Sequence, residues 1–242
     1  MENRTDVFLE TFREQPPVYI QELERYAAEN EVPVIRRGTR DLLRYLLRTK
    51  RPERVLEVGT AIGYSALFMK ENLPENSSIT TVEKVPARLE EARKNFEKYD
   101  SEGQIHLLEG DAAKVLRQLV EEKTSGERTD QEGLLFDFVF MDAAKGQYLN
   151  FLPDVLTLMK GGGILLSDNI FHEGDVMESR YAVTRRDRTI HGRMREYLQV
   201  LTRHEQLETI CLPIGDGVTI STKMEELQIY EKTGNPGSGQ QS

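Results

Sequence analysis

Short apolar segments alternate along this chain with segments of helical periodicity, and this alternation constrains the fold more than any other feature. The apolar segments have the length of strands and cover residues 54–58, 78–83, 104–108, 136–141 and 163–167. The helical patterns between them cover residues 64–72, 86–99, 112–122 and 147–159. Strands that are joined through helices form βαβ units and pair in parallel. We therefore predict an α/β fold with a Rossmann-like, doubly wound sheet.

The two ends of the pattern depart from this alternation. The last two apolar segments, residues 207–212 and 217–222, have no helix between them, so we expect an antiparallel hairpin at one edge of a seven-stranded sheet. About three helices precede the first strand; one follows Pro16-Pro17 and another covers residues 38–48. We predict one domain over residues 1–223, with a helical cap at 1–50 and a core at 54–223.

Three segments between or after these elements are rich in polar residues or glycine. Residues 160–163, Lys-Gly-Gly-Gly, are predicted to end a helix. Residues 121–133 read as a surface loop, and residues 224–242 as a polar, disordered tail.

Composition excludes several classes of protein. The 242 residues are 38% hydrophobic and 30% charged, which suits a globular domain and not a disordered chain. Cys211 is the one cysteine, so no internal disulfide is possible and a cytoplasmic protein is expected. The first residues lack the apolar core of a signal peptide, and no apolar run reaches the length of a membrane span.

Charge is distributed unevenly. The net charge is −9, which by itself disfavours nucleic acid as a partner. Residues 34–54, however, carry eight basic residues and two acids, and residues 180–195 carry six arginines and one acid. Each of these basic segments is either a solvated helix face, neutralised by acids elsewhere in the chain, or a surface that contacts phosphates. Tyr148, Phe171 and Tyr181 are candidates for stacking a base, and each could equally belong to the core.

A glycine-rich turn and two acids follow the first three strands. The turn reads Glu57-Val-Gly59-Thr-Ala-Ile-Gly63-Tyr-Ser65, which differs from the spacing in dinucleotide enzymes. Glu83 ends the second strand, where a carboxylate accepts hydrogen bonds from ribose hydroxyls, and Asp111 follows the third. Each feature alone has a simpler explanation: a tight turn, a solvated glutamate or a helix N-cap. Together, in this order, they indicate a pocket for S-adenosylmethionine.

Hard oxygen ligands follow the fourth and fifth strands. Asp142 comes directly after the fourth strand, and Asp168-Asn169 after the fifth. Because the carboxyl ends of neighbouring parallel strands meet at one edge, these three side chains are candidate ligands for Mg²⁺ or another hard divalent cation. Lys145 lies three residues after Asp142. A cation nearby would favour its neutral form, so Lys145 is a candidate general base. The alternatives are a turn, a helix cap and a surface lysine.

The motifs LEVGTAIGYSA, FMDAAKGQY, SDNI and PIGDGVTIS resemble those of the metal-dependent O-methyltransferases, the class I S-adenosylmethionine enzymes that include the catechol and caffeoyl-coenzyme A O-methyltransferases. The resemblance covers residues 19–223. Within this family the chain is most similar to the bacterial tRNA 5-hydroxyuridine methyltransferases, in the run DAAKGQYLNF, in the VPVI segment and in the arginines after the fifth strand. In the plant enzymes, the region after the fifth strand recognises the substrate. Here it is polar and basic.

The resemblance implies a role for each matching residue. It implies a metal site, a cofactor pocket, a base and a homodimer that acts on tRNA. The metal ligands are Asp142, Asp168 and Asn169; the residues of the cofactor pocket are Ile35, Gly59, Ser65, Glu83, Asp111 and Asp142; the catalytic residues are Lys145 and Asp142.

The expected activity is methylation of 5-hydroxyuridine at the wobble position of tRNA, with S-adenosylmethionine as donor and Mg²⁺ as cofactor. One alternative is a small-molecule O-methyltransferase for catechols or caffeoyl-coenzyme A, which would use the same site residues. Another is a non-catalytic module that binds S-adenosylmethionine and RNA, which the complete set Asp142, Lys145, Asp168 and Asn169 disfavours. An NAD-dependent dehydrogenase is disfavoured by the glycine spacing.

Overall fold

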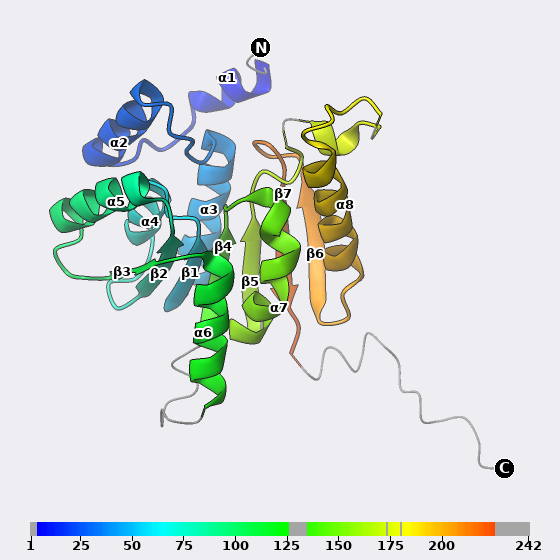
Figure 1. Cartoon of the computed structure of the whole chain (residues 1–242). Helices are drawn as coiled ribbons and strands as arrows, with labels where there is room; N and C mark the ends of the chain where they lie inside the picture. Colours follow the sequence, from blue (N-terminus) through cyan, green and yellow to red (C-terminus); the bar gives the residue numbers. More distant parts are fainter. Residues whose placement is uncertain (1–3, 126–134, 173, 180, 226–242) are drawn as a thin grey trace.

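The computed structural model describes residues 4–125, 135–172, 174–179 and 181–225 (Figure 1). Seven strands form one sheet in the order β3-β2-β1-β4-β5-β7-β6. The strands are β1 (Arg54–Val58), β2 (Ser78–Glu83), β3 (Ile105–Glu109), β4 (Phe136–Met141), β5 (Met159–Ser167), β6 (Leu207–Leu212) and β7 (Val218–Lys223).

The sheet changes winding direction beside β1. β1 pairs in parallel with β2 on one side and with β4 on the other, and β5 continues the parallel part beyond β4. β7 pairs antiparallel with both β5 and β6, which leaves β6 at the edge. The predicted mostly parallel sheet with an antiparallel C-terminal hairpin is therefore confirmed. Between β1 and β4 the connections leave in opposite directions, and this is where open α/β sheets bind their ligands.

Helices cover both faces of the sheet (Figure 1). One face is packed by α2 (Val18–Glu29), α3 (Arg37–Lys50), α4 (Tyr64–Lys70) and α5 (Pro86–Tyr99). The other is packed by α6 (Ala112–Thr124), α7 (Tyr148–Leu158) and α8 (Arg188–Arg203). Successive side chains of a strand point to opposite faces, so Val55 joins the first core and Leu56 the second, and both are fully buried. Burial on both faces explains why the strand segments are almost continuously apolar.

Ion pairs join the first part of the helical cap to α3, its last helix. α1 (Arg4–Glu10), α2 and the segment between them supply carboxylates to the arginines of α3. Arg40 lies 2.9 Å from Glu24, and Arg48 lies 2.8 Å from Glu14. Arg37 and Arg44 also pair with acids. For these four arginines of the first basic segment, the structure favours neutralisation within the protein over contact with a phosphate.

The glycines at 161–163 do not end a helix as predicted. α7 ends at Leu158 and β5 begins at Met159, so residues 160–163 belong to the strand. The register between β4 and β5 shifts between Phe136 and Phe138, and Gly162 has a φ of 74°. Met159 and Ile164, on either side of the glycines, pair with Phe136 and Phe138 of β4, so the glycines form the irregularity between two paired residues of one strand.

Two other predictions fall partly outside the described residues. α6 continues to Thr124, so the first part of the predicted loop 121–133 is helical, and residues 126–133 lie outside the described part of the chain. Residues 226–242 of the predicted tail lie outside it as well. Within the described residues, no helix is long and apolar enough to span a membrane.

Candidate functional site

A cavity of about 750 Å³ opens at the carboxyl ends of β1, β2, β3 and β4. The structure places every predicted cofactor-pocket residue in its wall, together with Lys145 and Asn169. Asp168 lies behind the wall and is fully buried. The lining residues also include Arg36, Tyr64, Arg88, Gln147, Phe151 and Asp216, which the sequence did not single out.

The glycine-rich turn after β1 forms the floor of this cavity. Gly59 has a φ of 111° and Gly63 a φ of 84°, a region of backbone conformation that favours glycine. A Cβ atom at Gly59 would lie 2.2 Å from the carbonyl oxygen of Asp142, and one at Gly63 would lie 2.6 Å from the ring of Phe96. Both glycines are therefore required by the close packing of the turn, whether or not a ligand is bound.

Glu83 is held at the end of β2 by backbone amides. Its Oε2 accepts a hydrogen bond from the amide of Ala61 at 3.0 Å, and its Oε1 accepts from Lys84 and Val85 at 2.8 and 2.9 Å. The carboxylate thus connects the glycine-rich turn to the start of α5. The two amides on Oε1 use both of its lone pairs, whereas Oε2 keeps one that can accept a ribose hydroxyl.

Asp111 caps a helix and also lines the cavity. It is the N-cap of α6, because its Oδ1 accepts a hydrogen bond from the amide of Ala113 at 3.1 Å. Its Oδ2 lies 2.9 Å from the ammonium group of Lys84. The hydrogen bond from Lys84 is the main cause that lowers the pKa of Asp111. The carboxylate therefore stays ionised at the rim of the cavity.

The predicted metal ligands come together at the ends of β4 and β5. Asn169 donates from its side-chain amide to Oδ1 of Asp142 at 3.0 Å. Asp168 accepts at Oδ1 from Thr39 and from the amide of Asn169, whereas its Oδ2 is buried without a hydrogen-bond partner in the described structure. Asn169 itself has a φ of 56°, a conformation that asparagine tolerates better than most residues.

The donor set fits a hard divalent cation. Burial raises the pKa of Asp142, and burial together with the charge of Asp142 raises the pKa of Asp168 to about 7. A cation between the two would relieve this repulsion and satisfy the unpaired oxygen of Asp168. Within the described residues, no group of three or more His, Cys, Asp or Glu side chains could hold a metal. The third protein ligand would therefore be the amide oxygen of Asn169.

Lys145 begins the short 3-10 helix η2 (Lys145–Gln147) and lines the same cavity as Asp142 and Asn169. It is half-buried, and its charge stabilises the ionised form of Asp142. The η2 turn is held from α8, because Arg193 donates a hydrogen bond to the carbonyl oxygen of Gly146 at 2.7 Å.

Two side chains of the first turn of α3 reach the site and were missed in the sequence. Thr39 bonds Asp168, and Arg40 lies with its Nη1 3.4 Å from the hydroxyl of Tyr64, which lines the cavity. Neither residue is part of a strand end or a glycine-rich motif. The one signal was their position in an amphipathic helix with a polar first turn.

The three aromatic candidates for base stacking differ in how far they are buried. Tyr148 is fully buried, and its hydroxyl lies 3.1 Å from the carbonyl oxygens of both Met141 and Asp168. It therefore belongs to the core and joins the ends of β4 and β5. Tyr181 is 90% exposed, and Phe171 is half-buried behind Gly217.

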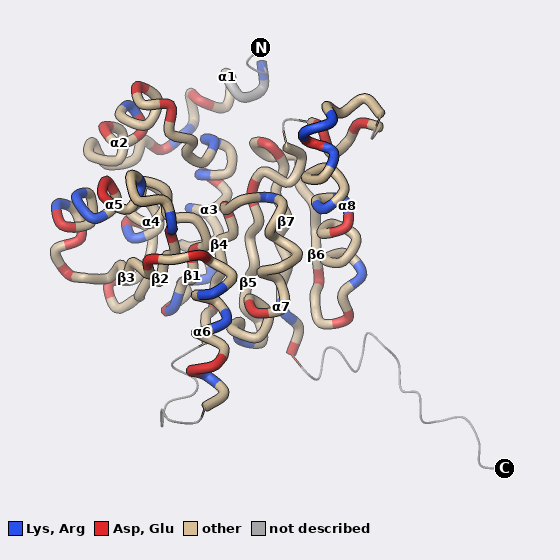
Figure 2. The backbone as a smooth tube through the Cα atoms, in the orientation of Figure 1, with Lys and Arg blue, Asp and Glu red and all other residues tan. Residues whose placement is uncertain are grey.

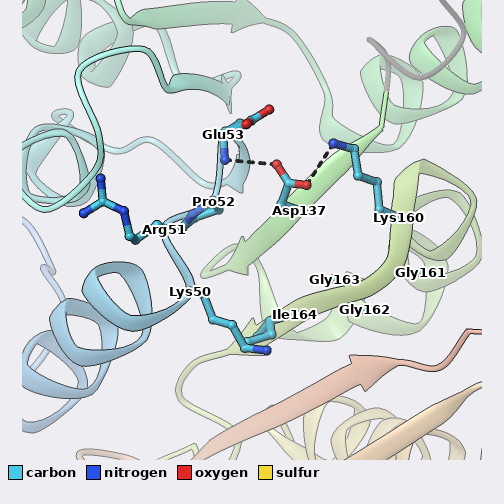
Figure 3. Close-up of a pocket in the computed structure, with 10 residues that line it drawn as sticks. All are labelled: Lys50, Arg51, Pro52, Glu53, Asp137, Lys160, Gly161, Gly162, Gly163 and Ile164. Atoms are coloured by element: carbon cyan, nitrogen blue, oxygen red, sulfur yellow. Dashed lines mark hydrogen bonds and ion pairs between the residues drawn. The ribbon is translucent and has the colours of Figure 1, made fainter.

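A second, smaller cavity of about 340 Å³ lies at the opposite, amino-terminal edge of the sheet (Figure 3). Asp137 accepts hydrogen bonds from the amides of Glu53 and Arg54 at 3.0 and 2.9 Å and pairs with Lys160 at 2.9 Å. These contacts tie β1, β4 and β5 together. Ligands of parallel sheets bind at the other edge, so this cavity is a structural feature.

In the second basic segment, residues 180–195, the arginines do not form the ion pairs with acids that the arginines of α3 form, within the described residues. Arg193 and Arg195 donate to the backbone carbonyls of Gly146 and Val176, and Arg188 to that of Val183. Arg185 and Arg186 are exposed, and within the described part of the chain no carboxylate lies within ion-pair distance of either. Figure 2 shows basic positions on the segment that leads into α8 and along the helix. Arg180 lies outside the described residues.

Comparison with known proteins agrees with this arrangement. The O-methyltransferase ankF of Aspergillus thermomutatus is 31% identical over 191 residues, with 73% of each chain covered. The caffeoyl-CoA O-methyltransferase of Eucalyptus gunnii is 29% identical, with 76% of this chain and 71% of the relative covered.

Solved structures share the fold. The SAH-bound methyltransferase PaMTH1 of Podospora anserina superposes with a TM-score of 0.78 at 24% identity, over 92% of this chain and 94% of that one. The profile of the O-methyltransferase family matches residues 10–224, which include most of the cap, the glycine-rich turn and all residues that line the cavity. This chain therefore belongs to the O-methyltransferase family.

Proposed function

We propose that this protein transfers a methyl group from S-adenosylmethionine to a hydroxyl oxygen that is held beside Asp142, Asp168 and Asn169. The observation that carries the proposal is the meeting of two chemically different halves in one cavity. One half has acids and a glycine-rich turn suited to a nucleoside, and the other is lined by Asp142 and Asn169, with the buried, incompletely bonded carboxylate of Asp168 behind them. The family to which the chain belongs supports the same reaction.

The cofactor half is built for a nucleoside with a charged tail. Glu83 would accept a ribose hydroxyl at Oε2, since three backbone amides already hold its carboxylate in place. Gly59 lets the turn after β1 pack directly against the backbone of Asp142, which joins the cofactor half of the cavity to the acceptor half. Asp111 would lie beside the base at the end of β3, and Ser65 and Ile35 would complete the wall.

The acceptor half would hold a divalent cation through Asp142, Asp168 and Asn169. When bound, such a cation lowers the pKa of an acceptor hydroxyl and orients its oxygen toward the methyl donor. Lys145, on the rim of the same cavity, would take the proton from the hydroxyl. Phe151 and Ile35 line the cavity, and their apolar surface excludes water from the donor–acceptor line.

The first candidate acceptor is a small aromatic compound with neighbouring hydroxyls. Relatives named caffeoyl-CoA and catechol O-methyltransferase support it. The test is methylation of catechol with S-adenosylmethionine and Mg²⁺, followed by chromatography of the monomethyl ether, with and without a chelator. Product that forms only with the metal supports the proposal. Absence of product with catechol and with caffeoyl-CoA contradicts this acceptor class.

The second candidate acceptor is 5-hydroxyuridine at the wobble position of tRNA. Exposed Arg185 and Arg186, together with Tyr181, support it, because RNA recognition needs unpaired cations and accessible aromatic faces. Arg36 adds a further cation in the cavity wall. A homodimer that acts on tRNA is part of this candidate through the resemblance to the tRNA enzymes.

The two candidates predict a different dependence of activity on salt concentration. Methylation of a tRNA substrate should fall steeply with ionic strength, and replacing Arg185 and Arg186 by Ala should reduce the slope of log K against log salt by about one per lost phosphate contact. Arg203, an exposed arginine at the other end of α8, provides the matched control. If tRNA that contains 5-hydroxyuridine is not methylated at low salt, the RNA candidate is wrong.

A further inference from the structure

Thr39 connects the helical cap directly to a candidate metal ligand. It lies in the first turn of α3 and is fully buried. Its hydroxyl donates a hydrogen bond of 3.1 Å to Oδ1 of Asp168, which is 129 residues away in the chain. A threonine hydroxyl in a helix usually bonds a carbonyl of the preceding turn. Here it is used instead for a carboxylate at the end of β5.

The two carboxylate oxygens of Asp168 differ in their hydrogen bonds. Oδ1 receives both the hydroxyl of Thr39 and, at 2.8 Å, the amide of Asn169. Oδ2 is buried and has no hydrogen-bond partner among the described residues. Two donors from different elements on one oxygen prevent rotation of the carboxylate. The arrangement leaves Oδ2 as the oxygen available to a cation.

The turn between β6 and β7 leaves room for this hydroxyl. Gly215 has a φ of 62°, and a Cβ atom there would lie 2.7 Å from Oγ1 of Thr39. A Cβ atom at Gly38 would lie 3.1 Å from the side chain of Ile214, in the same turn. The backbones of α3 and of this turn therefore pack together closely around the Thr39–Asp168 contact.

We propose that Thr39 is a positioning residue of the metal site: its hydroxyl holds Asp168 so that Oδ2 is presented to the divalent cation. This inference rests on the proposed function, because it assumes that Asp168 binds a metal. Partners that orient a ligating carboxylate affect metal affinity strongly, typically by 10- to 100-fold. A purely structural threonine would affect the stability of the fold and leave metal affinity unchanged.

The test compares Thr39→Val, which keeps the shape and loses the hydroxyl, with Thr39→Ser, which keeps the hydroxyl. Binding of Mn²⁺ is measured by electron paramagnetic resonance, and S-adenosylmethionine binding by calorimetry. Thr39→Val should weaken Mn²⁺ binding about tenfold, the effect of one hydrogen bond to a charged group. Its affinity for S-adenosylmethionine should change less than about twofold. Thr39→Ser should bind Mn²⁺ as the wild type does.

Thr219→Val is the matched control. Thr219 is also fully buried, and its hydroxyl has no hydrogen-bond partner in the described structure, so its loss should not change Mn²⁺ affinity. If Thr39→Val does not fold, Thr39→Ala provides the same comparison with a smaller side chain. Gly215→Ala, which would displace the hydroxyl, should weaken Mn²⁺ binding as well.

Two negative results would have different meanings. Wild-type Mn²⁺ affinity in a folded Thr39→Val or Thr39→Ala variant, with only a lower melting temperature, would overturn the role of Thr39 and leave the proposed function intact. A wild-type protein that binds S-adenosylmethionine but no Mn²⁺ would overturn the metal part of the proposed function, and the role of Thr39 with it.

Discussion

Gly59 lies so close to Asp142 that a Cβ atom at position 59 would stand 2.2 Å from the Asp142 carbonyl oxygen. The glycine belongs to the turn that forms the floor of the cofactor half, and the aspartate begins the acceptor half. Because the two backbones touch, a change in the turn after β1 is transmitted to the metal ligand after β4. The two halves of the site therefore depend on each other through the backbone.

Gly59→Ala should destabilise the protein and remove cofactor binding. The new Cβ must displace a backbone atom, and alanine is strained at a φ of 111°. We expect a loss of about 3 kcal/mol or more in the free energy of unfolding, measured in urea. Gly192→Ala is the control: this residue lies within α8 with open space around it, so alanine should stabilise the helix by up to about 1 kcal/mol. Equal stability of Gly59→Ala and wild type would contradict the packing described here.

Glu83→Ala should weaken S-adenosylmethionine binding at least tenfold in calorimetry. The variant loses the hydrogen bond from the ribose to Oε2, worth about 1.5–3 kcal/mol, and also loosens the turn at Ala61. Glu109→Ala is a matched control, because Glu109 pairs in register with Glu83 at the end of the neighbouring strand and is occupied by Arg93. An unchanged dissociation constant for Glu83→Ala would place the ribose elsewhere.

Asp168→Ala should abolish methyl transfer and leave S-adenosylmethionine binding within about threefold of wild type. The loss in rate should be on the order of 1000-fold, because the hydroxyl acceptor loses the charge stabilisation that the metal supplies. Asp142→Ala should impair both methyl transfer and S-adenosylmethionine binding, since Asp142 lines the cavity and its side chain bonds Asn169. Treating the wild type with a chelator should reproduce the Asp168→Ala phenotype, with recovery on addition of Mg²⁺. Full activity of the wild-type protein in the presence of the chelator would contradict the metal mechanism.

Glu57→Gln should make the protein more resistant to heat at pH 8 but not at pH 4. Burial raises the pKa of Glu57 to about 7, and its Oε1 has no hydrogen-bond partner in the described structure. An acid with a raised folded-state pKa binds more protons in the folded than in the unfolded state. Stability therefore falls as pH rises from about 4.5 to 7 and stays low above it.

The glutamine variant lacks this charge, so its melting temperature at pH 8 should exceed that of wild type by on the order of 5 °C. Asp168 has a pKa shifted in the same direction, so part of the pH dependence should persist in the variant. Scanning calorimetry at pH 4, 6 and 8 measures both effects. A parallel pH dependence in the two proteins would show that folding does not raise the pKa of Glu57.

Sequence reasoning succeeded where local pattern and strand topology are sufficient. The apolar segments predicted the strands, and the absence of a helix between residues 212 and 217 predicted the hairpin of β6 and β7. Because parallel strands present their carboxyl ends at one edge, the same reasoning predicted that Glu83, Asp111 and Asp142 would meet in one cavity.

The sequence was insufficient where a contact between distant elements outweighs the local pattern. The glycines at 161–163 are typical of a helix end, but they lie within β5, because the residues on either side of them, Met159 and Ile164, pair with β4. For the arginines of α3 the sequence left open a surface for phosphates and neutralisation by acids elsewhere, and only the folded chain places acids at positions 10, 14, 24 and 41 next to them. A count of charges along the chain contains no information about which charges become neighbours.

The sequence by itself determined the α/β fold, the position of the glycine-rich turn and the acids at the strand ends, because these depend on period, spacing and chain direction. Only the tertiary structure decided that Thr39 reaches Asp168, that Asp168 keeps one buried oxygen without a partner, and that Tyr148 belongs to the core. The physical reason is that burial and hydrogen-bond completion are properties of the packed chain. A donor can satisfy a carboxylate 129 residues away only after the helix and the strand that carry them have docked.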